Sequence, residues 1–152
     1  MRISAKVDYA VRAMCELAAH TGDAPLKAEQ IASAQEIPLS YLENILVDLR
    51  RAGFVRSLRG QVGGYRMARP AANITIADVI RAVEGPLADV RGMRPEGLVF
   101  KGTATNLRDV WLATRVSLRR VLERVSIADV VHGTIDPEVS VLLEDPEALV
   151  PH

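Results

Sequence analysis

The sequence predicts a mainly α-helical fold with one small β-hairpin and, after the hairpin, one long helix. Of its 152 residues 49% are hydrophobic but only 4% are aromatic, so the core must consist of aliphatic side chains, which favours helices packed on helices. Apolar residues recur at intervals of three and four along much of the chain, as they do on the buried face of a helix. After Gly53 this period changes to a glycine-rich stretch bounded by β-forming residues.

The first third of the chain predicts three short helices. An apolar stripe marks the first, which the turn-forming residues 21–25 end, and a shorter helix follows from about Leu26. The third is expected within residues 37–53, where apolar residues follow the spacing i, i+3, i+4, i+7 and Gly53 ends the helix. The first stripe consists of Ile3, Val7, Ala10, Val11, Met14, Leu17 and Ala18, and the third of Leu42, Ile45, Leu46 and Leu49.

The residues after Gly53 predict a β-hairpin. Residues 54–60 and 63–68 are short, rich in β-forming residues, and joined by glycines. The alternative for RGQVGGYRMARP (59–70) is a loop that binds a nucleotide phosphate. Such a loop requires Gly-Lys-Ser/Thr and a helix directly after it, whereas here no such triplet follows and the next segment is a strand. The hairpin is therefore the favoured interpretation.

The second half predicts three further helices. One begins near Thr75 with a capping-box pattern and ends at Gly85, and residues 85–103 have no clear period, so we expect a linker and a candidate sensing region there. A long helix over about 105–125 carries a heptad seam, and its additional apolar residues favour a dimer over the alternative of an ordinary buried helix. A short helix follows to Gly133, and then an acidic tail that we expect to be partly disordered. The seam, our candidate dimer interface, consists of Leu107, Trp111, Thr114, Leu118, Val121 and Val125.

Composition excludes several functions. No apolar run is long enough to span a membrane and no signal-peptide core is present, so we expect a cytoplasmic protein without a membrane partner. Cys15 is the single cysteine and the three histidines are scattered, so we expect no disulfide, no metal, no cofactor and no enzymatic nucleophile–base pair. The 19 basic and 19 acidic residues balance, yet residues 49–70 contain six arginines and no acidic residue.

Three short helices followed by a hairpin is the order of a winged helix-turn-helix, whose third helix enters the DNA major groove and whose hairpin tip reaches the backbone or minor groove. Serine, glutamate and asparagine can contact bases, and glycines let a backbone approach the duplex closely. Ser40 and Glu43 also match a capping box, so beginning the helix is an alternative role for both; for Tyr41 the alternative is packing. The DNA-binding candidates are Ser40, Tyr41, Glu43, Asn44, Arg59, Gly60, Gly63 and Gly64, with Arg2, Lys6, Arg50 and Arg51 for the phosphates.

Three segments resemble the Rrf2 family of bacterial winged-helix transcriptional regulators. They are MRISAKVDYAVRAM (1–14), SYLENILVDLRRAGFVRSLRGQVGGYRMARP (40–70) and ITIADVIRAVEGP (74–86). The resemblance is close over residues 1–86 and looser beyond. It implies a DNA-binding domain over 1–84, a linker over 85–103, a dimerisation region over 104–133 and a tail over 134–152. It also implies a homodimer that binds a palindromic operator in double-stranded DNA, with repression the favoured outcome over activation.

One segment departs from the family pattern. Many members hold an iron–sulfur cluster through three cysteines before the long helix, but here GPLADVRGMRPEGLVFKGTATNLRD (85–109) contains no cysteine and no histidine. Such clusters require thiolates, so we expect a member without one. A small-molecule ligand and a regulatory protein partner both remain open as the signal. The alternative function is a winged-helix module that binds only proteins.

Overall fold

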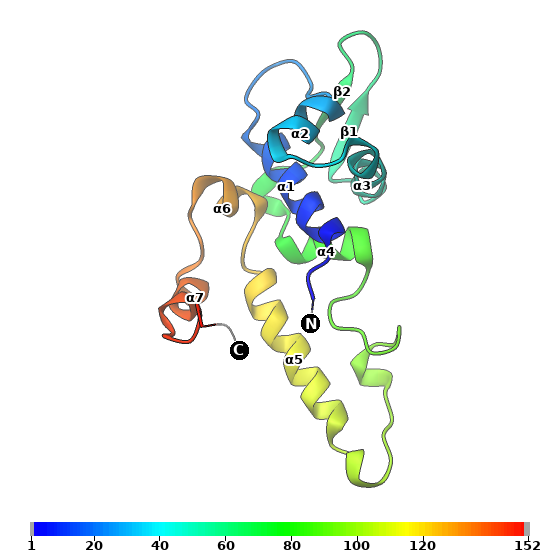
Figure 1. Ribbon diagram of the computed structural model, residues 1–152, viewed down its shortest axis with the longest axis vertical. Coiled ribbons are helices and arrows are strands. Elements are labelled where there is room, and N and C mark those ends of the chain that lie inside the picture. Colours follow the sequence, from blue (N-terminus) through cyan, green and yellow to red (C-terminus); the bar gives the residue numbers. More distant parts are fainter. Residues whose placement is uncertain (1, 151–152) are drawn as a thin grey trace.

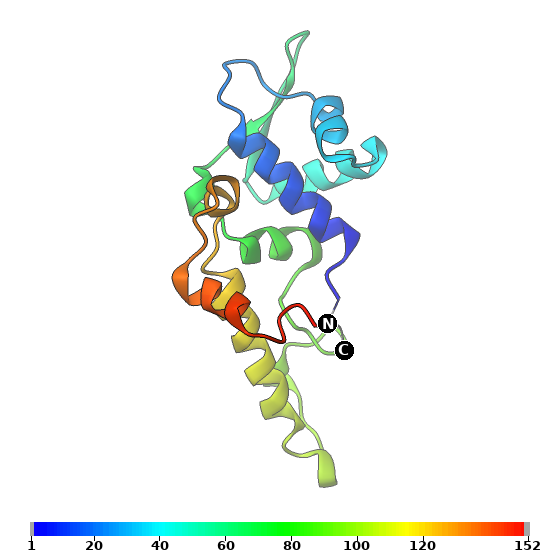
Figure 2. The same ribbon diagram turned by 60° about the vertical axis from the view of Figure 1, so that its left-hand side comes forward.

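The elements occur in the predicted order. The computed structural model of the protein describes residues 2–150 (Figure 1). In two views, α5 extends away from a body formed by the remaining larger helices and the hairpin (Figures 1 and 2). The N-terminal half contains α1 (Ala5–Ala19), α2 (Ala28–Gln35), α3 (Leu39–Arg51), β1 (Val55–Leu58), β2 (Gly64–Met67), the 3-10 turn η1 (Ala71–Asn73) and α4 (Ile76–Glu84). The C-terminal half contains η2 (Pro95–Gly97), η3 (Gly102–Ala104), α5 (Leu107–Leu122), α6 (Ile127–His132), α7 (Pro137–Ser140) and η4 (Val141–Glu144).

The core lies between α1 and the helices packed around it. Ala10, Ala13 and Met14 of α1 are completely buried, and the small alanines let neighbouring helices approach closely. The predicted stripe of α3 is also buried at all four positions. Ile3 is an exception to the first predicted stripe: it precedes α1 and is 71% exposed.

The hairpin is attached through β2 to the segment between α1 and α2. β1 and β2 pair antiparallel, and Leu26 pairs with Tyr65 at the outer edge of β2. The Leu26 N–H donates to the Tyr65 carbonyl at 3.1 Å, and the Tyr65 N–H donates to the Leu26 carbonyl at 2.7 Å. A Cβ atom on Gly64 would collide with the Leu26 carbonyl, so glycine is required for this contact. The end of β2 next to the hairpin tip is thereby fixed to the segment that precedes α2.

The junction of α4 and α6 closes the body. The Ile76 N–H donates to the Val125 carbonyl and the Ile127 N–H to the Ile74 carbonyl, both at 2.9 Å. Both helices begin at capping boxes, at Thr75 as predicted and at Ser126. Because α6 packs against α1 and η1, we group α1–α4, the hairpin and α6 as the winged domain.

The side chains of helix α5 are covered far less than those of the winged domain. The helix ends at Leu122, so Val125 lies beyond it; Val125 is only 7% exposed, and its carbonyl accepts a hydrogen bond from the Ile76 N–H of α4. This corrects the predicted seam, which loses its last member. No residue of α5 is buried. The acidic segment after Gly133 contains α7 and η4, and its partial disorder stays a prediction. Within residues 2–150, none of the helices combines the length and the apolar character needed to cross a bilayer.

Candidate nucleic-acid interface

Helix α3 presents a polar face opposite its buried stripe. Ser40, Tyr41, Glu43 and Asn44 are all exposed, as the sequence predicts for this face. They lie in the first two turns of the helix, where base-contacting residues of a recognition helix are found. The structure therefore brings these four candidates together on one surface.

The capping alternative for Ser40 and Glu43 does not hold. Helix α3 begins at Leu39 with Pro38 as its N-cap, and no side chain caps it. Ser40 is thus the second helical residue, and its carbonyl accepts a hydrogen bond from the Asn44 amide at 3.0 Å. With Pro38 as the N-cap, the helix begins two residues earlier than a capping box at Ser40 would require. Both side chains are left on the exposed surface.

Tyr41 combines packing with exposure. Its ring meets the Tyr9 ring edge-on, with 5.7 Å between centroids and an interplanar angle of 87°. The residue is still 45% exposed. The packing fixes the direction of the ring at the border of the polar face.

The tip of the hairpin carries Arg59 and Gly60, both exposed. Gly60 has φ +110°, a backbone conformation that favours glycine. A Cβ on Gly63 would lie 2.7 Å from the carbonyl oxygens of Leu58 and Gly60, so the tight turn requires glycine there too. Gly63 and Gly64 are half-buried, and their absent side chains serve the turn and the Leu26 contact. Arg59 and Gly60 are the accessible members of the set.

Two hairpin arginines were not among the predicted site residues. Arg56 and Arg66 are directly opposite each other in the register of β1 and β2. Like charges at such positions repel unless an anion lies between or beside them. They line a cavity of about 290 Å³ together with Arg69. The acid-free arginine run was the available signal, but the pairing depends on the register of the turn.

The four predicted phosphate contacts divide into two groups. Arg50 is exposed and reaches the Ser57 hydroxyl at 3.4 Å, and Arg51 is 76% exposed at its side chain and lies 3.6 Å from Asp48. Both belong to the end of α3 beside the hairpin. Lys6 and Arg2 form the second group.

Lys6 and Arg2 lie elsewhere. The Lys6 Nζ atom is 2.8 Å from the Asp48 carboxylate and donates to the Val83 carbonyl at 2.7 Å, so it joins α1, α3 and α4. Arg2 lines a cavity with Ile80 and Leu118, near α4 and α5 rather than the hairpin. The N-terminus is at the base of the body, away from the wing (Figure 1).

The remaining seam residues are half-buried against their own chain. Trp111 and Thr114 line a cavity with Ala88–Arg91, and Leu118 lines another with Leu87. On other sides of α5, Val110 is 53% and Val116 44% exposed. Leu107 and Val121 are likewise of intermediate exposure. The helix therefore offers partly covered apolar surface on several sides.

The donor set does not fit an iron–sulfur cluster. Residues 85–109 supply no thiol or imidazole, and residues 2–150 contain no group of three or more side chains placed to hold a metal ion. Cys15 is half-buried on α1, where burial and then the Glu16 carboxylate raise the pKa of its thiol. A single protonated thiol cannot replace three thiolates.

A three-helix unit with a polar third helix and a basic hairpin defines a winged helix-turn-helix protein of the DNA-binding class. Residues 3–133 match the family model of Rrf2, described as an iron-dependent transcriptional regulator. The chain belongs to the Rrf2 family of transcriptional regulators, a family of regulators rather than enzymes.

Relatives agree with this assignment. An HTH-type transcriptional regulator of Mycobacterium tuberculosis is 47% identical over 145 residues, which cover 95% of this chain and 90% of the relative. CymR of Bacillus subtilis is 33% identical over 134 residues, which cover 88% of this chain and 92% of CymR.

Solved structures confirm the predicted fold class. The structure of CymR (YrzC), the global cysteine regulator of B. subtilis, is similar with a TM-score of 0.73 and 32% identity, and the match covers 90% of this chain and 99% of CymR. IscR of T. potens is similar with a TM-score of 0.68 and 32% identity, and the match covers 100% of this chain and 93% of IscR. The mainly helical architecture with one hairpin is therefore that of these regulators.

Proposed function

We propose that this protein is a homodimer that binds a palindromic operator and represses transcription without an iron–sulfur cluster. The observation that carries the proposal is the exposed polar face of α3, whose serine, glutamate and asparagine are engaged in no cap. In a winged helix-turn-helix these positions meet base edges in the major groove. Glutamate accepts from the cytosine amino group and asparagine pairs with adenine.

The hairpin supplies the second contact. Arg59 is exposed at a glycine-containing tip, and an arginine there suits the negative potential of a narrow minor groove. Arg56 and Arg66 repel each other in the free protein, and a DNA phosphate beside them would relieve that repulsion. Arg50 and Arg51 extend the basic surface toward α3.

The dimer is supported by the poor coverage of α5. A helix of 16 residues without one buried side chain gains little stability from its own chain. Pairing two copies through the seam would cover Trp111, Thr114 and Leu118 and repeat the α3 surface by two-fold symmetry. Two symmetric recognition helices correspond to a palindromic site.

The test selects sites from random-sequence DNA with the purified protein and measures affinity by fluorescence anisotropy across salt concentrations. Arg59→Ala should weaken specific binding by about 1–3 kcal/mol. Glu43→Ala should relax base preference at one position while circular dichroism stays unchanged. Arg108→Ala, an exposed arginine on α5, is the matched control and should bind as the wild type does.

Three results would contradict the proposal. They are a selected pool with no common sequence, full affinity for DNA with a single half-site, and higher reporter expression from the selected site when the protein is present than when it is absent. The first removes operator recognition, the second the dimer, and the third repression.

A further inference from the structure

A cavity of about 470 Å³ lies where α4, the segment after it and α5 meet. Four arginines line it: Arg81 from α4, Arg94 from the segment before η2, and Arg115 and Arg119 from α5. The lining includes one acidic residue, Glu96. The volume is that of a small-molecule site, and its four arginines outnumber the three carboxylates that pair with them, those of Asp78, Glu96 and Glu123, so the surface attracts anions.

Ion pairs within the chain use only part of these donors. Arg115 pairs with Glu96, Arg81 and Arg119 share the carboxylate of Glu123, and Arg81 also lies 3.4 Å from the Asp78 carboxylate. Each guanidinium carries five N–H donors. Arg94 takes part in none of the ion pairs among residues 2–150. The cavity therefore has more donors than acceptors.

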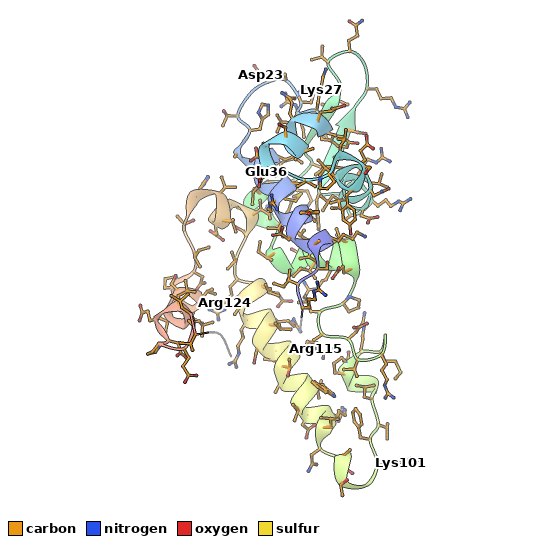
Figure 3. All side chains as sticks on the ribbon, in the orientation of Figure 1. Asp23, Lys27, Glu36, Lys101, Arg115 and Arg124 are labelled. Carbon is orange, nitrogen blue, oxygen red and sulfur yellow. The ribbon has the colours of Figure 1, made fainter. Side chains whose placement is uncertain are left out.

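Two buried donors on α5 also have no partner within residues 2–150, one in the cavity lined by the four arginines and the other, one turn away, in the separate cavity that Trp111 lines. The Arg115 Nε atom is buried, and within residues 2–150 it has no hydrogen-bond partner; the same holds for Trp111 Nε1. The two residues are four positions apart and so share one face of α5, the side that η2 contacts. Figure 3 shows Arg115 on α5 where the helix runs beside the chain that follows α4. Buried donors without acceptors are costly, so an added acceptor would be stabilising.

We propose that this arginine cavity (Arg81, Arg94, Arg115 and Arg119) binds a small molecule that carries an oxyanion, such as a carboxylate, phosphate or sulfate. Arginine binds such groups through two parallel hydrogen bonds, which gives both strength and orientation. The chain itself provides an internal example, because Arg115 already holds the Glu96 carboxylate. Hydrogen bonds from its own backbone N–H and from Arg115, with the charge of Arg94 nearby, lower the pKa of Glu96.

The cavity connects α4 of the winged domain with α5, so a bound anion would join these two parts. An effect on the spacing of two wings rests on the proposed function. Binding of the anion does not, and it is measured without DNA.

The test uses Trp111, the single tryptophan, as the reporter. Its fluorescence is followed during titration of the full-length protein with inorganic phosphate, sulfate, succinate and citrate, with chloride holding ionic strength constant. Thermal unfolding in the same solutions is the second readout. We expect saturable binding of at least one oxyanion at up to millimolar concentration.

Three variants sharpen the result. Arg94→Ala removes an exposed side chain with no ion pair and should weaken binding about tenfold or more, the loss typical of one charge-assisted hydrogen bond. Glu96→Gln removes the internal competitor and should tighten binding. Arg108→Ala, equal in charge change but outside the cavity, should leave binding unchanged.

Two outcomes would overturn the proposal. One is the absence of saturable change in both readouts for every anion, and the other is equal binding by Arg94→Ala and the wild type. Loss of DNA binding in a protein that still binds the anion would contradict only the proposed function.

Discussion

The winged domain and the long helix α5 carry similar apolar periods but are buried very differently. All four stripe residues of α3 have no measurable exposure, whereas α5 has no buried residue. A helical period predicts that a face is to be covered, but it does not specify what covers it. In the winged domain, other elements of the same chain cover the apolar face of α3. For α5, the same chain supplies a partial cover from α4 and the segment 85–98, which leaves surface and cavities for other molecules.

The largest effect that tests this comparison is a core truncation. Leu46→Ala should lower the free energy of unfolding by about 2–5 kcal/mol, because it leaves a cavity in a closely packed core. Leu143→Ala removes the same atoms where the side chain is 72% exposed, and should change stability by about 0.5 kcal/mol or less. Urea denaturation measures both. Equal costs would mean that the burial contrast has no energetic counterpart.

The next effect concerns what covers α5. Leu118→Glu should produce monomers, because it places an unpaired charge in the seam between two chains. DNA affinity should then fall roughly tenfold or more, since one recognition helix reaches only one half-site. Light scattering and anisotropy measure these changes.

Val116→Glu is the control for that substitution. Val116 is two residues from Leu118 and therefore on the opposite side of α5, where it is 44% exposed. We expect a dimer in this variant. Monomers from Val116→Glu and dimers from Leu118→Glu would move the interface to the exposed valine side.

Local patterns account for what the sequence could predict. The α3 stripe, the hairpin and the Thr75 cap each depend on residues a few positions apart, and each is present as predicted. The polar face of α3 followed from the same spacing. The alternative role of Ser40 and Glu43, a capping box, is absent because Pro38 serves as the N-cap without a side-chain hydrogen bond.

Contacts between distant segments account for what the sequence could not predict. Lys6 resembled a phosphate ligand, but it pairs with Asp48 once α1 packs on α3. Val125 matched a heptad, yet it packs beside Ile76 after the helix has ended. The opposition of Arg56 and Arg66 and the arginine cavity also arise only when separate elements meet.

A smaller effect is expected where the start of β2 contacts Leu26. Gly64→Ala should lower the free energy of unfolding by about 1–3 kcal/mol, because the added Cβ collides with the Leu26 carbonyl. Gly97→Ala is the matched control, since its Cβ would meet no atom within 4 Å. Urea denaturation distinguishes the two variants. Equal stability would show that β2 and Leu26 can move apart to accept the added Cβ.

The smallest effect concerns the capping box that begins α6, beside the end of α5. The Asp129 carboxylate accepts from the Ser126 hydroxyl at 2.6 Å and from the Ser126 N–H at 2.8 Å. These hydrogen bonds, the hydroxyl first, lower the pKa of Asp129. The carboxyl group of Asp129 binds a proton more weakly in the folded state than in the unfolded state. Its contribution to the free energy of unfolding is therefore complete above the ordinary aspartate pKa. It is lost as pH falls through the lowered value.

Asp129→Asn should therefore make the free energy of unfolding less dependent on pH in the acid range. Near neutral pH it should lower that free energy only by the loss of the charged capping residue. Asp23→Asn changes an exposed loop aspartate outside this cap, labelled in Figure 3, and should keep the wild-type acid profile. Thermal unfolding from neutral to acid pH measures the difference. Parallel profiles for all three proteins would mean that the α6 cap does not couple protonation to folding. The position of α6 within the winged domain would then depend on apolar packing around Ile127, which is fully buried.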